Sequence, residues 1–177
     1  MRTIILLTLL ILSPQLYAND GLYMQVGLGG SRPIVKPEYR PEDTTSEQNN
    51  NLAAQLSLGY QFKNNIVLEG GYIGHLSTGF TLNDHNSINE LVLVAGYSFD
   101  ISKSWSITPR AGISRWKLDS DEGAYLNPGD EQQTITSGQD FTYMLTATYQ
   151  AFFMTYQGTN FEFGRGRAVI FGANINF

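Results

Sequence analysis

Residues 52–62 read LAAQLSLGYQF, and the alternation in this stretch decides the fold. One set of alternate positions is small or polar and includes Gln55, Ser57 and Gly59. The other set is apolar: Leu52, Ala54, Leu56, Leu58, Tyr60 and Phe62. A period of two residues places these two sets on opposite faces of a β-strand.

The same period recurs along the chain and predicts eight strands. They are Gly21–Gly30, Leu52–Phe62, Ile66–Leu76, Ile88–Phe99, Trp105–Lys117, Gln139–Tyr149, Phe152–Gly158 and Ala168–Phe177. Long gaps lie at 31–51, 77–87, 118–138 and 159–167, and short ones at 63–65, 100–104 and 150–151. This alternation is typical of four long outer loops and three short periplasmic turns. The turn at 150–151 carries no Gly or Pro signal, so its position stays open.

The two faces favour a membrane barrel over a water-soluble one. Leu56, Leu93 and Phe171 stand on the apolar face, which we expect to face lipid. The second face is small, polar and partly charged, as suits a lumen. An open sheet edge is not tolerated in hydrocarbon, so we expect a closed, all-β, antiparallel barrel whose interior is filled by side chains. Aromatic residues at strand ends suggest an interfacial girdle: Tyr60, Phe62, Tyr97, Phe99, Tyr149 and Phe177.

The first residues resemble an export signal. Arg2 precedes an apolar run from Ile4 to Leu12, and Ala18 suits a cleavage site. We therefore expect residues 1–18 to be a signal peptide and 19–177 to form the barrel. Without Arg2, ten basic residues stand against sixteen acidic ones, which argues against nucleic-acid binding. The chain has no cysteine, and hence no disulfide framework.

Two segments resemble the OmpA/OmpX-type small outer-membrane barrels. Val67–Tyr72 resembles the third-strand pattern of that family, with an inward Glu69. The C-terminus resembles the signal read by the barrel assembly machinery, through Gly172, Ile175 and Phe177, although Ile170 departs from it. The resemblance implies the outer membrane of a Gram-negative bacterium. It fixes no activity, since members include structural, adhesive and host-interaction proteins.

Charged residues on the inner face suggest a plug. Glu69, Glu90 and Arg110 alternate onto that face, and hairpin pairing predicts that Glu69 and Arg110 flank Val94. Because a lone buried charge is strongly destabilising, we expect Glu69 and Arg110 to pair. The alternative is a narrow ion path through the same two residues.

His75, Ser77 and Glu90 form the one set that resembles catalytic machinery. The set is similar to the His-x-Ser and carboxylate of outer-membrane lipid A deacylases, in which His activates a Ser nucleophile. Here it lies between the third and fourth strands instead of near the C-terminus, and the alternation turns it toward the lumen. A lipid A-modifying hydrolase is therefore the alternative function, and a non-enzymatic barrel the main hypothesis.

Four basic residues lie near the predicted outer rim: Arg165, Arg167, Arg115 and Lys117. We expect them to contact lipopolysaccharide phosphates. We find no phosphate-binding loop, dinucleotide fingerprint or metal-ligand set, so we expect no cofactor. The main hypothesis is a monomeric surface barrel whose four loops mediate adhesion or contact with host or envelope components.

Overall fold

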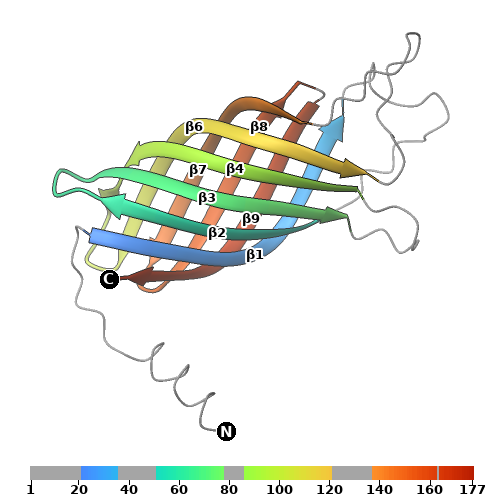
Figure 1. The fold of residues 1–177 in the computed structure, drawn as a ribbon. Coiled ribbons are helices and arrows are strands. Elements are labelled where there is room, and N and C mark those ends of the chain that lie inside the picture. The colour runs from blue at the N-terminus through green and yellow to red at the C-terminus, as the bar shows by residue number, and fades with distance from the viewer. Residues whose placement is uncertain (1–20, 36–50, 78–85, 121–136, 163) are drawn as a thin grey trace, which may run out of the picture.

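The computed structural model describes residues 21–35, 51–77, 86–120, 137–162 and 164–177. The described residues form one antiparallel sheet in the order β4-β3-β2-β1-β9-β8-β7-β6-β5, and a further β4–β6 pairing closes it (Figure 1). Among these residues there is no helix long and apolar enough to cross a membrane. The predicted eight-stranded closed barrel is confirmed.

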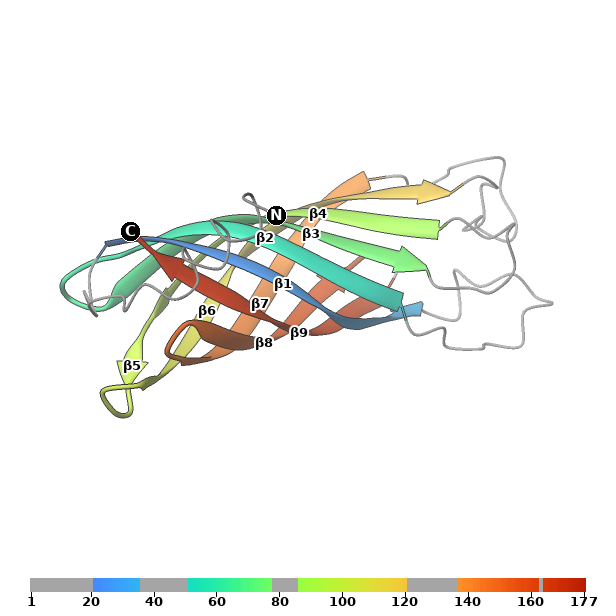
Figure 2. The ribbon, with the colours of Figure 1, turned by 90° about the horizontal axis from the view of Figure 1, so that it is seen from below.

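The strands are longer than the sequence pattern predicts at several outer ends. Their bounds are β1 Gly21–Val35, β2 Asn51–Gln61, β3 Ile66–Ser77, β4 Asn86–Tyr97, β5 Phe99–Asp100, β6 Trp105–Ser120, β7 Ser137–Tyr149, β8 Phe152–Phe161 and β9 Gly164–Asn176. β4 and β5 are two parts of one wall strand, because both pair with β6 in the same register on either side of Ser98. Figure 2 shows β5 and its turn projecting at the end where the C-terminus lies.

The exterior of the barrel is apolar, as predicted. Leu56, Leu93 and Phe171 are 53%, 52% and 57% exposed, whereas Glu69 and Arg110 are 1% and 4% exposed. The predicted girdle residues are all exposed near the short-turn end, and Tyr60 and Phe62 pack edge to face with ring centroids 4.9 Å apart. An apolar outer wall with a buried charged interior is the arrangement that suits acyl chains outside.

Aromatic rings fill the space above glycines on the inner face. A Cβ on Gly59 would lie 2.2 Å from Cζ of Tyr23, and a Cβ on Gly138 would lie 2.6 Å from Cζ2 of Trp116. Each glycine pairs in register with the residue whose ring covers it. Glycine is therefore required where a ring lies flat against the wall.

The prediction of a small, polar inner face is wrong in the middle of the barrel. Eight buried apolar residues form a cluster there, which we call the apolar layer: Ala53, Ile73, Val92, Val94, Met144, Phe153, Ala168 and Ile170. An eight-stranded barrel is narrow enough for these side chains to meet across the lumen, so the interior packs like a core.

The predicted fourth long loop, at 159–167, is also wrong. β8 and β9 continue past the apolar belt and pair up to Phe161 and Gly164, which leaves only Glu162 and residue 163 between them. The outward residues of this extension, Asn160 and Arg165, are polar, so the pattern looked like a loop. The other three long connections contain 36–50, 78–85 and 121–136, which lie outside the described residues.

The turn left open at 150–151 joins β7 to β8 directly. Tyr149 pairs with Phe152, so Gln150 and Ala151 form a two-residue connection. Gln150 adopts a φ of 53°, in the left-handed region that turns of this length require.

Candidate functional site in the lumen and at the rim

Arg110 on β6 is the centre of a buried polar cluster near the short-turn end. Its Nη1 donates to Oε2 of Glu69 on β3, and its Nη2 donates to Oγ1 of Thr146 on β7. Tyr23 on β1 donates its hydroxyl to the same Glu69 oxygen over 2.6 Å. Thr155 completes this Arg110 network through a 2.7 Å hydrogen bond with Thr146. The structure thus brings Glu69 and Arg110 together across the lumen.

The register differs from the expectation that both residues flank Val94. Glu69 lies opposite Val94, but Arg110 lies opposite Gly96, two residues farther toward the short turns. A Cβ on Gly96 would lie 2.6 Å from Cγ of Arg110. Gly96 therefore leaves room for the long Arg110 side chain to reach Glu69.

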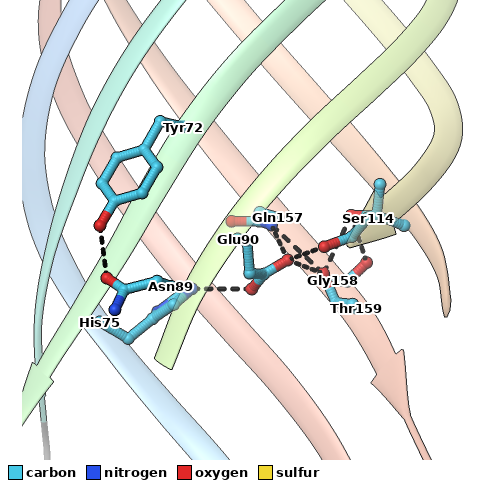
Figure 3. Close-up of polar contacts among 9 residues, drawn as sticks. Tyr72, His75, Asn89, Glu90, Ser114, Gln157, Gly158 and Thr159 are labelled. Carbon is cyan, nitrogen blue, oxygen red and sulfur yellow. Dashed lines mark hydrogen bonds and ion pairs between the residues drawn. The ribbon is translucent and has the colours of Figure 1, made fainter. Parts of the chain in front are cut away.

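Glu90 on β4 is the centre of a second cluster, whose contacts Figure 3 shows. It lies near the start of β4, at the end of the barrel that carries the long connections. Its Oε1 lies 2.8 Å from Nε2 of His75, on β3. Its Oε2 accepts hydrogen bonds from Ser114, Gln157 and Thr159 at 2.6, 3.2 and 3.0 Å. We call these five residues the Glu90 network. Both carboxylate oxygens are used, so the charge is stabilised inside the wall.

His75 and Glu90 therefore make a contact that a catalytic pair would make, but in the wrong place for a lipid substrate. Both are buried, at 5% and 1% exposure, on the inner face. Ser77 is the last residue of β3 and pairs with Asn51, while its side chain lies outside the described part. Acyl chains on the apolar exterior are separated from this pair by the barrel wall.

The apolar layer lies between the two charged pairs, although on β8 Thr155 of the Arg110 network and Gln157 of the Glu90 network are successive inward residues. Along β3, Ile73 lies between Glu69 and His75. Along β7, Met144 lies between Thr146 and Thr142, which shares a 3.0 Å hydrogen bond with Thr159 of the Glu90 network. Toward the long connections Trp116 is 1% exposed, and its ring lies 5.7 Å from that of Phe161. Since no ion can shed its hydration shell cheaply in such a layer, this arrangement disfavours conduction.

The predicted lipopolysaccharide contacts fall into two groups. Arg167 on β9 pairs with Arg32 on β1, and Arg165 lies two residues beyond Arg167 on the same face. All three are exposed, just past the outward apolar residues Leu28 and Val169, and we call them the arginine patch. Arg115 and Lys117 lie on β6, on the opposite side of the ring of strands. Sequence reasoning missed Arg32 because it ended the first strand at Gly30.

The residues of the predicted assembly signal lie on or next to the closing strand, β9. Gly172 faces the lumen beneath the ring of Phe153, Ile175 is partly exposed, and Phe177 is 69% exposed. Ile170, which departs from the signal pattern, is fully buried in the apolar layer. Packing inside the lumen thus explains why an apolar residue stands there.

The sequence did not predict several members of the two networks. Tyr23, Ser114, Gln157 and Thr159 carry ordinary polar or aromatic side chains, and their alternation shows only that they face inward. Their partners come from strands far apart in sequence, as the separations of 46 residues for Tyr23–Glu69 and 69 for Thr159–Glu90 show. Only the closed ring with its register reveals these contacts.

Comparison with known proteins agrees with the fold. No protein-family model matches the chain, and no curated protein matches its sequence. Neisserial surface protein A superposes with a TM-score of 0.68 at 12% identity, covering 89% of this chain and 97% of that one. Ail, the attachment invasion locus protein of Yersinia pestis, gives 0.56 at 15% identity, covering 89% and 99%. Ail in complex with the heparin analogue sucrose octasulfate gives 0.54 at 15% identity, covering 89% and 99%. The chain thus has the fold of small outer-membrane barrels of the OmpA/OmpX type.

Proposed function

We propose that this protein is a non-enzymatic barrel of the bacterial outer membrane that binds partners through its outer connections and rim. The observation that carries the proposal is the filled middle of the lumen. Both charged centres, Glu69–Arg110 and His75–Glu90, find partners inside the wall, and the apolar layer lies between them. The outer connections and the exposed rim then remain as the surfaces for a partner. Ail carries attachment in its name, and attachment is a role that a barrel with exposed outer surfaces can serve.

The route to the membrane is part of the proposal. Residues 1–18 act as a cleaved export signal, and Gly172, Ile175 and Phe177 are read by the barrel assembly machinery. The exposed position of Phe177 at the end of the closing strand supports this role. Deleting Phe177 is expected to slow assembly without changing export.

The arginine patch extends the proposal to lipopolysaccharide. Three exposed guanidinium groups at the edge of the apolar belt suit bidentate hydrogen bonds to phosphate. Arg115 and Lys117 provide a second contact across the barrel. The bound polysulfate in the Ail structure shows that a barrel of this fold can hold a polyanion, which supports a basic rim as a polyanion contact.

Attachment of whole cells tests the main proposal. Cells that display the wild type are expected to attach to host cells or extracellular matrix, and replacing residues 36–50 and 121–136 by short Gly-Ser linkers is expected to abolish attachment. A matched control, Lys103→Ala, changes an exposed residue at the opposite end and should attach normally. Equal attachment by cells with and without the native connections would overturn the proposal.

A further inference from the structure

The outer end of the first strand, β1, pairs with one neighbour. Its pairing with β2 ends at Ser31 and Asn51, whereas its pairing with β9 continues through positions 32–35 of β1 and 164–167 of β9. Among the described residues, positions 32–35 thus pair with β9 alone. We call these two stretches the outer seam, because β1 and β9 are the first and last strands and their pairing joins the two ends of the chain.

Two like charges face each other across the outer seam. Arg32 and Arg167 are direct partners in the register, so their Cβ atoms are about 5 Å apart. Arg165 lies two residues farther along the same face. Like charges placed directly opposite on neighbouring strands destabilise the pairing of those strands. The strand end that has one neighbour therefore also carries a repulsion.

No described group of the chain neutralises these charges. None of the three guanidinium groups has a hydrogen-bond or ion-pair partner among the described residues. On β8, the residues opposite Arg165 and Arg167 are Asn160 and Gly158, which are uncharged. As far as the structure describes β1 and the β8–β9 hairpin, their one acidic residue is Glu162, which lies in the turn. An anion from outside the chain would remove the repulsion, and the planar guanidinium group suits a phosphate.

Two tyrosines beside Arg167 indicate that this anion belongs to a lipid. Gly158 pairs with Tyr143 on one side and with Arg167 on the other. A Cβ on Gly158 would lie 2.4 Å from the hydroxyl oxygen of Tyr143, so the Tyr143 ring extends over β8 in the direction of β9. The ring centroid of Tyr156 lies 6.3 Å from that of Tyr143, and both side chains are exposed on the outer wall. Tyrosines on the outside of a membrane protein collect at the level of the lipid headgroups, which carry the phosphates.

We propose that a phosphate of lipopolysaccharide bridges Arg32 and Arg167 and thereby holds the outer end of β1 against β9. The inference rests on the lipopolysaccharide contact proposed above. It adds where the phosphate binds and what binding does, which is to strengthen the pairing of the first and last strands at the membrane surface. Arg165 is close enough along β9 to share the same phosphate group.

Amide hydrogen exchange of the whole folded barrel in lipid nanodiscs tests this inference. The nanodiscs contain phosphatidylcholine alone, phosphatidylcholine with lipid A, or phosphatidylcholine with lipid A from which the phosphates have been removed. Amides at 51–53 and 75–77, where β2 and β3 remain paired, are the internal reference. Relative to these, lipid A is expected to slow exchange in the outer seam at least about fivefold, the factor for one basic residue at an anionic surface. Dephosphorylated lipid A is expected to have no such effect.

Arg32→Gln with Arg167→Gln is expected to abolish the effect of lipid A. In phosphatidylcholine alone the same variant should exchange no faster than the wild type, because the repulsion is gone. The matched control, Lys63→Gln with Lys103→Gln, makes the same change in charge at two exposed residues of the short-turn end and should behave like the wild type. The comparison of lipids uses the wild type alone, so it decides the question even if the double arginine variant does not fold.

Three results would overturn the inference. They are equal slowing by dephosphorylated lipid A, equal slowing by inorganic phosphate added to nanodiscs of phosphatidylcholine, and an effect of lipid A that survives in the double arginine variant. If lipid A stabilises the barrel against unfolding without slowing exchange in the outer seam, the bridge is wrong but the general lipopolysaccharide contact stands. If lipid A changes neither, the contact itself is wrong.

Discussion

Tyr23 donates its hydroxyl to Glu69 over 2.6 Å, although the two residues lie on strands separated by β2. Gly59 of β2 pairs with Tyr23 on one side and with Glu69 on the other. The tyrosine ring crosses the strand at the one residue that has no side chain to block it. The charged centre of the barrel thus depends on a glycine that makes no polar contact itself.

Gly59→Ala is therefore expected to destabilise the barrel by about 1–3 kcal/mol, the usual cost of overpacking. The added Cβ would lie 2.2 Å from the Tyr23 ring, so the ring must move away from Glu69. Urea unfolding in lipid vesicles, followed by heat-modifiable mobility, measures this effect. The control is Gly70→Ala, where the nearest atom to the added Cβ is 3.9 Å away. Equal losses in the two variants would mean that the ring does not need the space.

The ion pair between Glu69 and Arg110 is expected to show strong non-additivity. Arg110→Met alone leaves a buried carboxylate without its cation and should cost about 3–5 kcal/mol. Combining it with Glu69→Gln should recover much of that loss, because no uncompensated charge remains. A double-mutant cycle of unfolding free energies gives the coupling. Additive losses would contradict a direct pair.

The barrel is expected to carry no steady ion current in planar bilayers, whether or not Glu69 and Arg110 are charged. Glu69→Gln with Arg110→Gln removes the charges but leaves the apolar layer, so no steady current should appear. Trimming the layer itself, by Met144→Ala with Phe153→Ala and Ile170→Ala, should allow water to enter and produce leak currents. Conductance that the wild type shows and the Glu69/Arg110 variant lacks would support the ion-path alternative instead.

The arginine patch is expected to stabilise the barrel in lipopolysaccharide more than in zwitterionic lipid. Replacing Arg32, Arg165 and Arg167 by Gln should remove roughly 1 kcal/mol of that added stability per arginine, as for basic residues near an anionic surface. The loss should shrink as salt is raised. Arg115→Gln with Lys117→Gln, on the opposite wall, tests whether the two groups act separately. Lipopolysaccharide-dependent stability that survives in the triple variant would rule out this contact.

The sequence predicted the wall of this barrel better than its interior. Alternation fixes which face a residue takes, so Leu56 and Phe171 were placed outward and Glu69 inward from the pattern alone. Strand ends were harder, because past the apolar belt the outward residues of β8 and β9 become polar, and a strand such as Asn160–Phe161 then resembles a loop. The alternation of apolar and polar residues is clear only over the part of each strand that contacts lipid.

The contacts inside the lumen needed the closed ring. Glu90 is held by residues from β3, β6 and β8, and nothing local in the sequence distinguishes Ser114 or Thr159 from other inward hydroxyls. The apolar layer was missed for a related reason. Ile170 and Phe153 belong to inward positions of apolar-rich strands, and only packing across the barrel shows that they meet.

The two tryptophans provide the most direct test of the central claim, that the apolar face of the wall contacts lipid while the opposite face fills the lumen. Trp105 is 48% exposed on the outside, and Trp116 is 1% exposed inside. In vesicles containing brominated acyl chains, the Trp116→Phe variant, which reports on Trp105, is expected to be strongly quenched. The Trp105→Phe variant, which reports on Trp116, is expected to retain its fluorescence. Strong quenching of Trp116 with no quenching of Trp105 would contradict the account.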